Sequence, residues 1–225
     1  VVDSSPMYGR AEGVVGDLAA ELELHRSLFL ATKVWTRGES AGVRQMEDSL
    51  RLLRAQRIDL MQVHNLVDWK THLKTLKSWK AQGRLRHIGI THYHAGAYDD
   101  LMAVLRTREF DFVQFNYSMA EREADQRLLP LCAEPGVGVL INRPFSQGDL
   151  FPRVKGKALP AWAAEFDCAS WAQFFLKWIL GHPAVTCAIP GTRRVVHLND
   201  NLGAARGRLP DEAMRRKMLG HLQAL

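Results

Sequence analysis

The sequence predicts an α/β fold, a (β/α)8 or TIM barrel of parallel strands, in a single domain over residues 1–225. Short apolar or β-branched runs alternate with amphipathic helical patterns along the whole chain, which is typical of parallel strands joined by helical crossovers. Polar residues follow the ends of several different runs, as in a barrel, whereas an open sheet collects its site at one switch point. No G-x-G-x-x-G motif follows the first run, which also favours the barrel.

The expected elements follow one another in regular order. In the helix expected at 41–55, Val43, Met46, Leu50 and Leu53 recur at spacings of three and four, so they form one apolar face. Seven strands are expected, at about 1–3, 28–34, 58–64, 85–90, 111–117, 137–142 and 184–190. Helical patterns occupy about 41–55, 70–82, 96–107, 123–134, 169–181 and 195–205.

Seven visible strands are one fewer than a (β/α)8 barrel needs. The first visible strand already carries a polar residue of the expected site, so we expect the missing first βα unit to precede Val1. The chain is then an N-terminally incomplete barrel, and a natural seven-stranded variant is the alternative. We expect a cytoplasmic protein, with export through a signal in the preceding segment as the other possibility.

Composition and charge exclude several classes of function. Thirty Lys and Arg against 24 Asp and Glu give a net charge of +6, but the basic residues are scattered, so no nucleic-acid partner is expected. No run approaches the roughly 18 apolar residues of a membrane span. The three cysteines show no C-x-x-C spacing and are expected to be reduced. Nothing in the sequence indicates an oligomeric state.

Four residues near strand ends suggest carbonyl chemistry: Asp3, Tyr8, Lys33 and His64. A hydride that reaches a carbonyl carbon leaves negative charge on the oxygen, and this oxygen needs a proton donor. An ammonium near a phenol stabilises the phenolate, so Lys33 would make Tyr8 a better donor. Asp3 would hold Lys33, and His64 would orient the substrate oxygen. Taken singly, Asp3 is interpreted as a cap of the following segment and His64 as a core histidine. The four residues together predict a catalytic quartet.

Seven motifs in order, each near a strand end, resemble the aldo-keto reductase family over nearly the whole chain. They are D-x-x-x-x-Y-G from Asp3, A-T-K, Q-V-H-N, G-I-T-H-Y, V-Q-F-N-Y-S, N-R-P-F-S-Q-G and I-P-G-T-R-R-x-x-H-x-x-D-N. The resemblance implies an NAD(P)H-dependent oxidoreductase that transfers a hydride between NADPH and a small-molecule aldehyde or ketone. It also implies that Tyr8 acts as the general acid and base.

The resemblance also implies where the nicotinamide end of the cofactor binds. Thr91, Gln114 and Asn116 match positions that hold or line the carboxamide pocket. His92 stands where the family usually has Asn, and Asn142 stands where an aromatic residue commonly stacks on the ring. The expected cofactor-binding residues around the ring are Thr91, His92, Gln114, Asn142, Arg143 and Pro144.

Segment 189–201 resembles the adenosine-phosphate clamp of the family. Arg193 and Arg194 suit a 2′-phosphate, so NADP is expected as the cofactor in preference to NAD. His197 replaces an Arg that is common at its position, and a solvated loop is the alternative for the arginine pair. The full expected clamp is Gly191, Thr192, Arg193, Arg194, His197, Asp200 and Asn201.

Two other functions compete with the reductase. A nucleotide-sensing or regulatory protein of the same family would keep the cofactor and show little turnover. A metal-dependent hydrolase would need ligands, and His92, His94 and His64 lack a carboxylate or Cys to complete a set. No metal is therefore expected.

Overall fold

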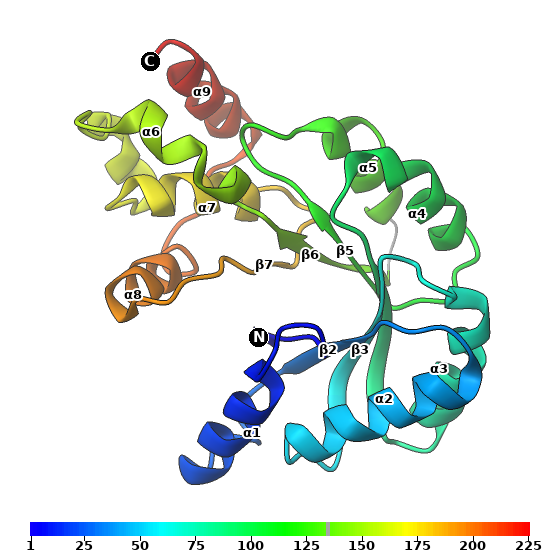
Figure 1. The fold of residues 1–225 in the computed structure, drawn as a ribbon. Coiled ribbons are helices and arrows are strands. Elements are labelled where there is room, and N and C mark those ends of the chain that lie inside the picture. Colours follow the sequence, from blue (N-terminus) through cyan, green and yellow to red (C-terminus); the bar gives the residue numbers. More distant parts are fainter. Residues whose placement is uncertain (134–135) are drawn as a thin grey trace. The chain divides into compact units, whose positions relative to one another are not determined.

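The computed structural model describes residues 1–133 and 136–225, and these divide into two compact units. The first unit contains Val1–Tyr93 and Asp99–Gln114, and the second contains His94–Tyr98 and Phe115–Leu225. Both are drawn in Figure 1. Each unit is described by itself below.

The first unit is built on parallel strands that pair in chain order. These strands are β1 (Val2–Asp3), β2 (Leu30–Val34), β3 (Ile58–His64), β4 (Leu85–Thr91) and the beginning of β5 (Phe112–Asn116). The register sets Lys33 beside Gln62, His64 beside Thr91, and Thr91 beside Gln114. Polar residues at the carboxyl ends of neighbouring strands therefore lie next to one another.

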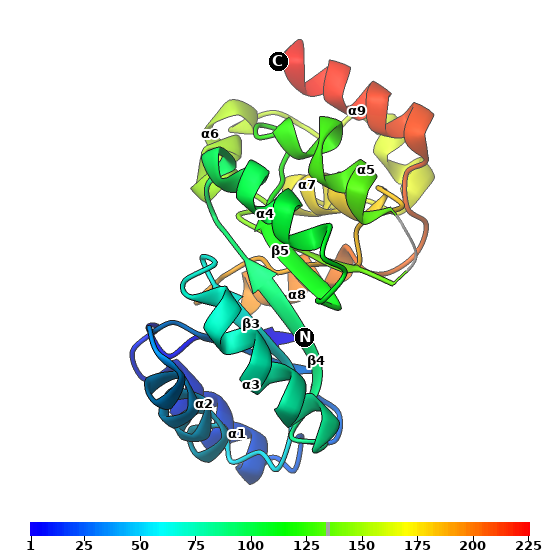
Figure 2. The same ribbon diagram turned by 90° about the vertical axis from the view of Figure 1, so that its right-hand side faces the viewer.

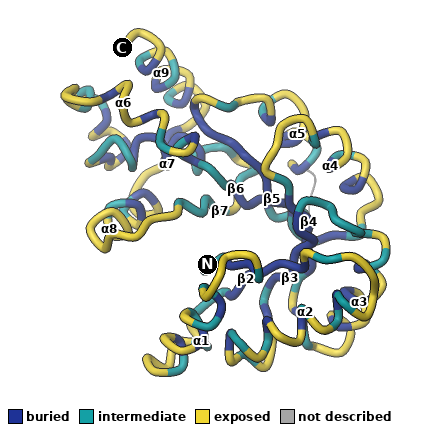
Figure 3. Tube along the Cα trace, in the orientation of Figure 1, coloured by how far each residue is buried: buried dark blue, intermediate teal, exposed yellow. Residues whose placement is uncertain are grey.

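Helices α1 (Ala11–Glu21), α2 (Glu39–Leu52) and α3 (Trp69–Ala81) pack in succession beside these strands, and α4 (Tyr98–Leu105) precedes β5 (Figure 2). Met46 and Leu53 of the predicted 41–55 pattern are fully buried, which confirms its apolar face. At Gly16 the backbones of α1 and α2 come close together, since a Cβ there would lie 2.0 Å from the Leu52 carbonyl oxygen. The tube in Figure 3 shows strands β2 and β3 largely buried and the outer turns of these helices exposed.

The second unit contains the end of β5, β6 (Gly138–Asn142) and β7 (Cys187–Ala188), with β6 and β7 parallel. Its longest helices are α7 (Trp171–Leu180), which Ser170 caps by accepting from the Gln173 N–H, α8 (Val195–Gly203) and α9 (Glu212–Gln223). Shorter elements are η1 (Ala95–Ala97), η2 (Glu123–Gln126), α5 (Leu128–Cys132), η3 (Ser146–Gly148), α6 (Leu150–Val154) and η4 (Ala161–Phe166).

Helix α7 forms the centre of this second unit. Phe174, Phe175 and Lys177 on it are fully buried. The Lys177 ammonium donates to the carbonyl oxygens of Arg206 and Arg208, at 2.6 and 2.9 Å, so its charge is solvated by backbone. This contact ties α7 to the segment that leads into α9.

The predicted α/β alternation with seven parallel strands is confirmed, and the strand order is the chain order from β1 to β7. Helix α1 was not among the predicted helices. The helix predicted at 123–134 is instead η2 followed by α5, because Arg127 departs from helical geometry (φ −132°) between them, and the predicted end at residue 134 lies outside the described residues. The strand predicted at 184–190 is limited to Cys187–Ala188. None of the described helices is both long and apolar enough to cross a membrane.

Candidate functional site

Strand pairing in the first unit brings Lys33 and Asp3 into contact. The Lys33 Nζ lies 2.6 Å from Asp3 Oδ2 and also donates to the Ser4 carbonyl oxygen at 2.7 Å. The side chains are only 1% and 8% exposed, so the ion pair is sheltered from water. Removing either partner would leave a charge buried without compensation.

The second oxygen of the Asp3 carboxylate is held by amides. Gln62 Nε2 donates to Asp3 Oδ1 at 3.2 Å, and the Gln114 side chain also hydrogen-bonds to Asp3. Burial raises the pKa of Asp3, while the Lys33 ammonium and the two amides act in the opposite direction. The carboxylate is thus fixed by groups from β2, β3 and β5.

Tyr8 and His64 lie beside this ion pair. The Lys33 Nζ is 5.0 Å from the centroid of the Tyr8 ring, and the Tyr8 and His64 rings meet edge to face with centroids 6.3 Å apart. Tyr8 is 47% exposed, whereas His64 is buried. The Trp35 ring lies 6.1 Å from His64 and is also exposed. The four predicted quartet residues are therefore close together, and solvent reaches them from the Tyr8 side.

The environment of His64 favours its neutral form. Burial, followed by the positive charges of Lys33 and His92, lowers the pKa of His64 to about 4. The Ser5 Oγ lies 3.3 Å from His64 Nδ1, and the Ser5 side chain is fully buried. If the Ser5 hydroxyl donates to Nδ1, the proton of the neutral ring is on Nε2, where it can be donated to a ligand.

Three predicted cofactor-binding residues belong to the first unit. Thr91 and Gln114 are adjacent in register and buried, at 2% and 3% exposure. The Gln114 Oε1 is buried and has no hydrogen-bond partner among the described residues, so it fits a ligand that offers an amide N–H. The His92 backbone N–H donates to the Gln114 carbonyl oxygen at 3.0 Å, and its ring stacks on Tyr93.

The second unit holds the other predicted residues. Asn142 ends β6, and its buried Oδ1 has no partner within the described part of the chain, which again suits a donor on a ligand. Arg143 follows in the left-handed region (φ 47°), and Pro144 is buried.

The predicted phosphate clamp is an exposed turn that leads into α8. Gly191, Thr192, Arg193, Arg194 and His197 are all exposed, and the Arg194 N–H donates to Thr192 Oγ1 at 3.2 Å. The first N–H groups of α8 lack a side-chain cap, and free N–H groups at a helix start favour an anion.

The two remaining predicted clamp residues are less accessible. Asp200 accepts hydrogen bonds from Ser170 Oγ at 2.7 Å and from Gln173 Nε2 at 2.8 Å, and Asn201 is buried. Asp200 therefore links α8 to α7. Binding of the cofactor by either residue stays a prediction.

Sequence reasoning missed the residues that hold the quartet in place. These are Ser4, Ser5 and Gln62, which contact Lys33, His64 and Asp3 respectively. Gln62 is two residues before His64, so the alternation of a strand puts both side chains on one face of β3. That spacing was the available signal. Among the described residues, no group of three His, Cys, Asp or Glu side chains is arranged to hold a metal ion.

Comparison with known proteins places these features in context. The model of the "Aldo/keto reductase family" matches residues 1–217. Methylglyoxal reductase YeaE of Escherichia coli is 27% identical over 208 residues, which cover 89% of this chain and 72% of that protein. An uncharacterized oxidoreductase of Schizosaccharomyces pombe is 29% identical over 167 residues, covering 73% of this chain and 52% of its own length.

Solved structures share the fold. The thermostable aldo-keto reductase Tm1743, in complex with the inhibitor epalrestat, superposes with a TM-score of 0.77 at 24% identity, covering 98% of this chain and 81% of that one. An aldo/keto reductase from Klebsiella pneumoniae in complex with NADP and acetate gives a TM-score of 0.76 at 24% identity, covering 99% and 78%.

Proposed function

Because the chain belongs to the aldo/keto reductase family, whose members are NAD(P)H-dependent oxidoreductases, we propose that it reduces a small aldehyde or ketone with NADPH. The observation that carries the proposal is the cluster of Tyr8, Lys33, Asp3 and His64 within one unit. In the reverse direction Tyr8 would act as the base while the corresponding alcohol is oxidised with NADP⁺ as the hydride acceptor. When bound, the nicotinamide supplies the hydride that adds to the carbonyl carbon.

Tyr8 is the proton donor in this proposal. Its half-exposed side chain is open to a ligand, and the Lys33 ammonium near its ring stabilises the negative charge that the phenol acquires as its proton leaves. The proton passes from Tyr8 Oη to the substrate oxygen and gives the alcohol. Asp3 and the Ser4 carbonyl oxygen keep the Lys33 ammonium in place during this transfer.

His64 orients the substrate in this proposal. A neutral ring with its proton on Nε2 donates a hydrogen bond to the carbonyl oxygen, so that this oxygen lies between His64 and Tyr8. Trp35, exposed beside His64, offers an apolar surface to the rest of the substrate.

NADPH is the proposed cofactor. The buried, unsatisfied Gln114 Oε1 fits the carboxamide N–H of a nicotinamide. Thr91 is adjacent to Gln114 in register, and the His92 N–H donates to the Gln114 carbonyl oxygen. Arg193 and Arg194, at the start of α8, suit the extra phosphate of NADP. The complex of the Klebsiella pneumoniae relative with NADP supports the same choice.

The proposal is tested by following NADPH oxidation with a panel of small carbonyls. Methylglyoxal belongs in the panel because a relative from Escherichia coli is a methylglyoxal reductase. Tyr8→Phe should lower kcat by about 10²- to 10⁴-fold, the usual contribution of a positioned acid. Tyr93→Phe is the matched control, because Tyr93 is equally exposed, at 45%, and lies outside the quartet. Wild-type turnover by the Tyr8 variant would refute the role of Tyr8, and NADPH binding without turnover of any carbonyl would favour a nucleotide-sensing protein.

A further inference from the structure

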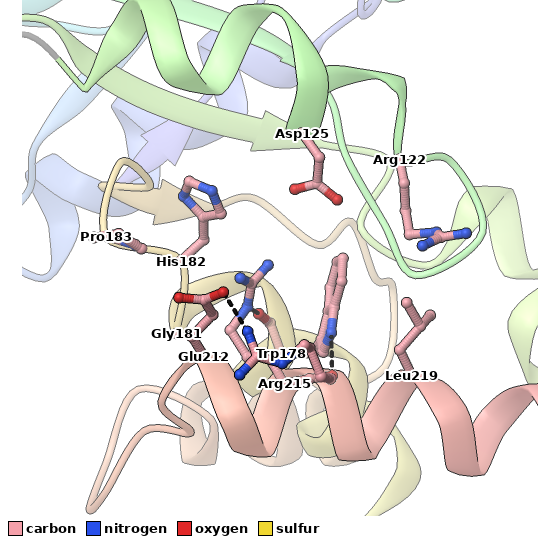
Figure 4. A pocket seen from close by; sticks show the side chains of 10 residues that line it. Arg122, Asp125, Trp178, Gly181, His182, Pro183, Glu212, Arg215 and Leu219 are labelled. Atoms are coloured by element: carbon pink, nitrogen blue, oxygen red, sulfur yellow. Dashed lines mark hydrogen bonds and ion pairs between the residues drawn. The ribbon is translucent and has the colours of Figure 1, made fainter.

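The second unit contains a pocket of about 550 Å³ that includes no residue of the quartet or of the predicted cofactor site. Three segments form its walls: the one after β5 with Arg122 and Asp125, the end of α7 with Trp178 and His182, and α9 with Arg215 (Figure 4). In this view Asp125 lies between His182 and Arg122, above the side chains of α9. The volume lies in the range of small-molecule sites, roughly 300–1,000 Å³.

Arg215 is the buried cation of this pocket. It is only 8% exposed, its Nε donates to the Trp178 carbonyl oxygen at 2.8 Å, and its Nη2 donates to the Tyr117 hydroxyl at 2.7 Å. Both partners are neutral, and no carboxylate of the described residues lies within ion-pair distance of the guanidinium. The nearest linked carboxylate is Asp125, which accepts from the Tyr117 hydroxyl. A buried guanidinium without its own counter-ion favours an anionic ligand.

His182 adds a neutral donor to the same pocket. Its Nδ1 accepts from the Ala184 N–H at 3.1 Å, so the proton of the neutral ring is on Nε2. Burial lowers the pKa of His182, and the charge of Arg215 acts in the same direction. The ring therefore offers a hydrogen bond near neutral pH and carries no charge.

The charges of the pocket decide which anion it suits. Arg216 pairs with Glu212 on α9, which cancels one guanidinium and one carboxylate. The other charged residues of the lining are Arg122, Arg215 and the single carboxylate of Asp125, so one net positive charge remains. A monoanion balances this charge, whereas a phosphate dianion would exceed it.

From these contacts we infer that the pocket binds a small organic carboxylate with an apolar body. The carboxylate group is received by Arg215 at the base and Arg122 at the rim, with the His182 Nε2–H as a further donor. A planar carboxylate matches the fork of N–H groups on a guanidinium. Trp178 and Leu219 supply the apolar part of the lining for the remainder of the ligand.

Isothermal titration calorimetry with benzoate tests this inference on the whole chain. Benzamide, which has the same shape without the charge, and inorganic phosphate serve as comparison ligands. We expect benzoate to bind the wild type more tightly than either. Equal affinity for benzamide, tighter binding of phosphate, or no detectable binding of benzoate would each overturn the inference.

Variants locate the binding. Arg122 is exposed, and its side chain makes no hydrogen bond or ion pair to another described residue, so Arg122→Met should fold normally and weaken benzoate binding about tenfold. Arg215→Gln should abolish it, and Arg44→Met, at an exposed arginine of α2, should leave it unchanged. An unchanged affinity of the Arg122 variant for benzoate would mean that the ligand binds elsewhere, and it would refute the site. This test remains decisive if the Arg215 variant does not fold.

Discussion

Replacing Lys33 by methionine tests the quartet at its most buried member. The substitution keeps much of the side-chain volume and removes the ammonium that contacts Asp3 at 2.6 Å. The Asp3 carboxylate, 8% exposed, then keeps only the amides of Gln62 and Gln114 as partners. Both the free energy of unfolding and kcat should decrease, for different reasons.

The two losses can be estimated separately. Leaving one partner of a buried ion pair without compensation costs about 3–5 kcal/mol of unfolding free energy. In catalysis, the Lys33 Nζ lies 5.0 Å from the Tyr8 ring centroid, and at an effective dielectric constant of about 20 its attraction for the developing phenolate is about 3 kcal/mol. The loss in kcat should therefore be about two hundredfold.

Urea denaturation and NADPH-dependent turnover, measured on the same preparations, distinguish these effects. In the double variant Lys33→Met/Asp3→Asn both charges are gone, so part of the stability should return while kcat stays low. Lys177→Met is the matched control, because Lys177 is equally buried and should lose stability but retain kcat in its folded fraction. A Lys33 variant with wild-type kcat, or a double variant with restored kcat, would refute the electrostatic role of Lys33.

Three further predictions concern packing, pH and cofactor choice. Gly16→Ala should destabilise the fold by about 2–3 kcal/mol, because its Cβ would lie 2.0 Å from the Leu52 carbonyl oxygen. Gly13→Ala should stabilise the fold by about 0.5–1 kcal/mol, because its Cβ would lie 3.8 Å from the Leu52 Cδ2, an ordinary contact distance. Urea denaturation of both variants checks these values. Since the pKa of His64 is about 4 in the fold against the ordinary histidine value of 6.5, the unfolded chain binds the extra proton, and stability should fall by roughly 2 kcal/mol as the pH drops from 6.5 to 4, with a smaller loss in His64→Gln. Replacing Arg193 and Arg194 by Ala should raise KM for NADPH about tenfold and leave KM for NADH unchanged, and an equal effect on both cofactors would contradict a contact with the extra phosphate.

Elements with a clear period were predictable from the sequence. Met46 marks the buried face of α2, and Leu53 continues it at the C-cap. Strands β2, β3 and β4 are rich in apolar and β-branched residues and are largely buried, as expected for strands covered on both faces. Helix α1 was not predicted, because Gly13 and Gly16 interrupt its apolar pattern. Glycine disfavours a helix unless close packing requires it. That requirement, the approach of Gly16 to Leu52, depends on tertiary structure.

The quartet was predictable as a set of residue types at strand ends, but its supporting contacts were not. The Ser4 carbonyl oxygen that binds Lys33 is a backbone group, and every residue carries one. The Gln114 amide reaches Asp3 from a strand more than a hundred residues later in the chain, and only the pairing of strands reveals this. Local pattern therefore indicates the chemistry, and strand register determines its geometry.

Lys177 and Lys33 offer a way to follow the opening of each unit separately. Each unit holds one of these buried ammonium groups, at 0% and 1% exposure, and each group is enclosed by backbone carbonyl oxygens or a carboxylate. Amine-reactive reagents can modify either lysine only after its surroundings open. The rate of modification at each lysine, read by mass spectrometry after digestion, then measures how often its own unit opens. Equal rates would mean that the two units unfold as one cooperative body.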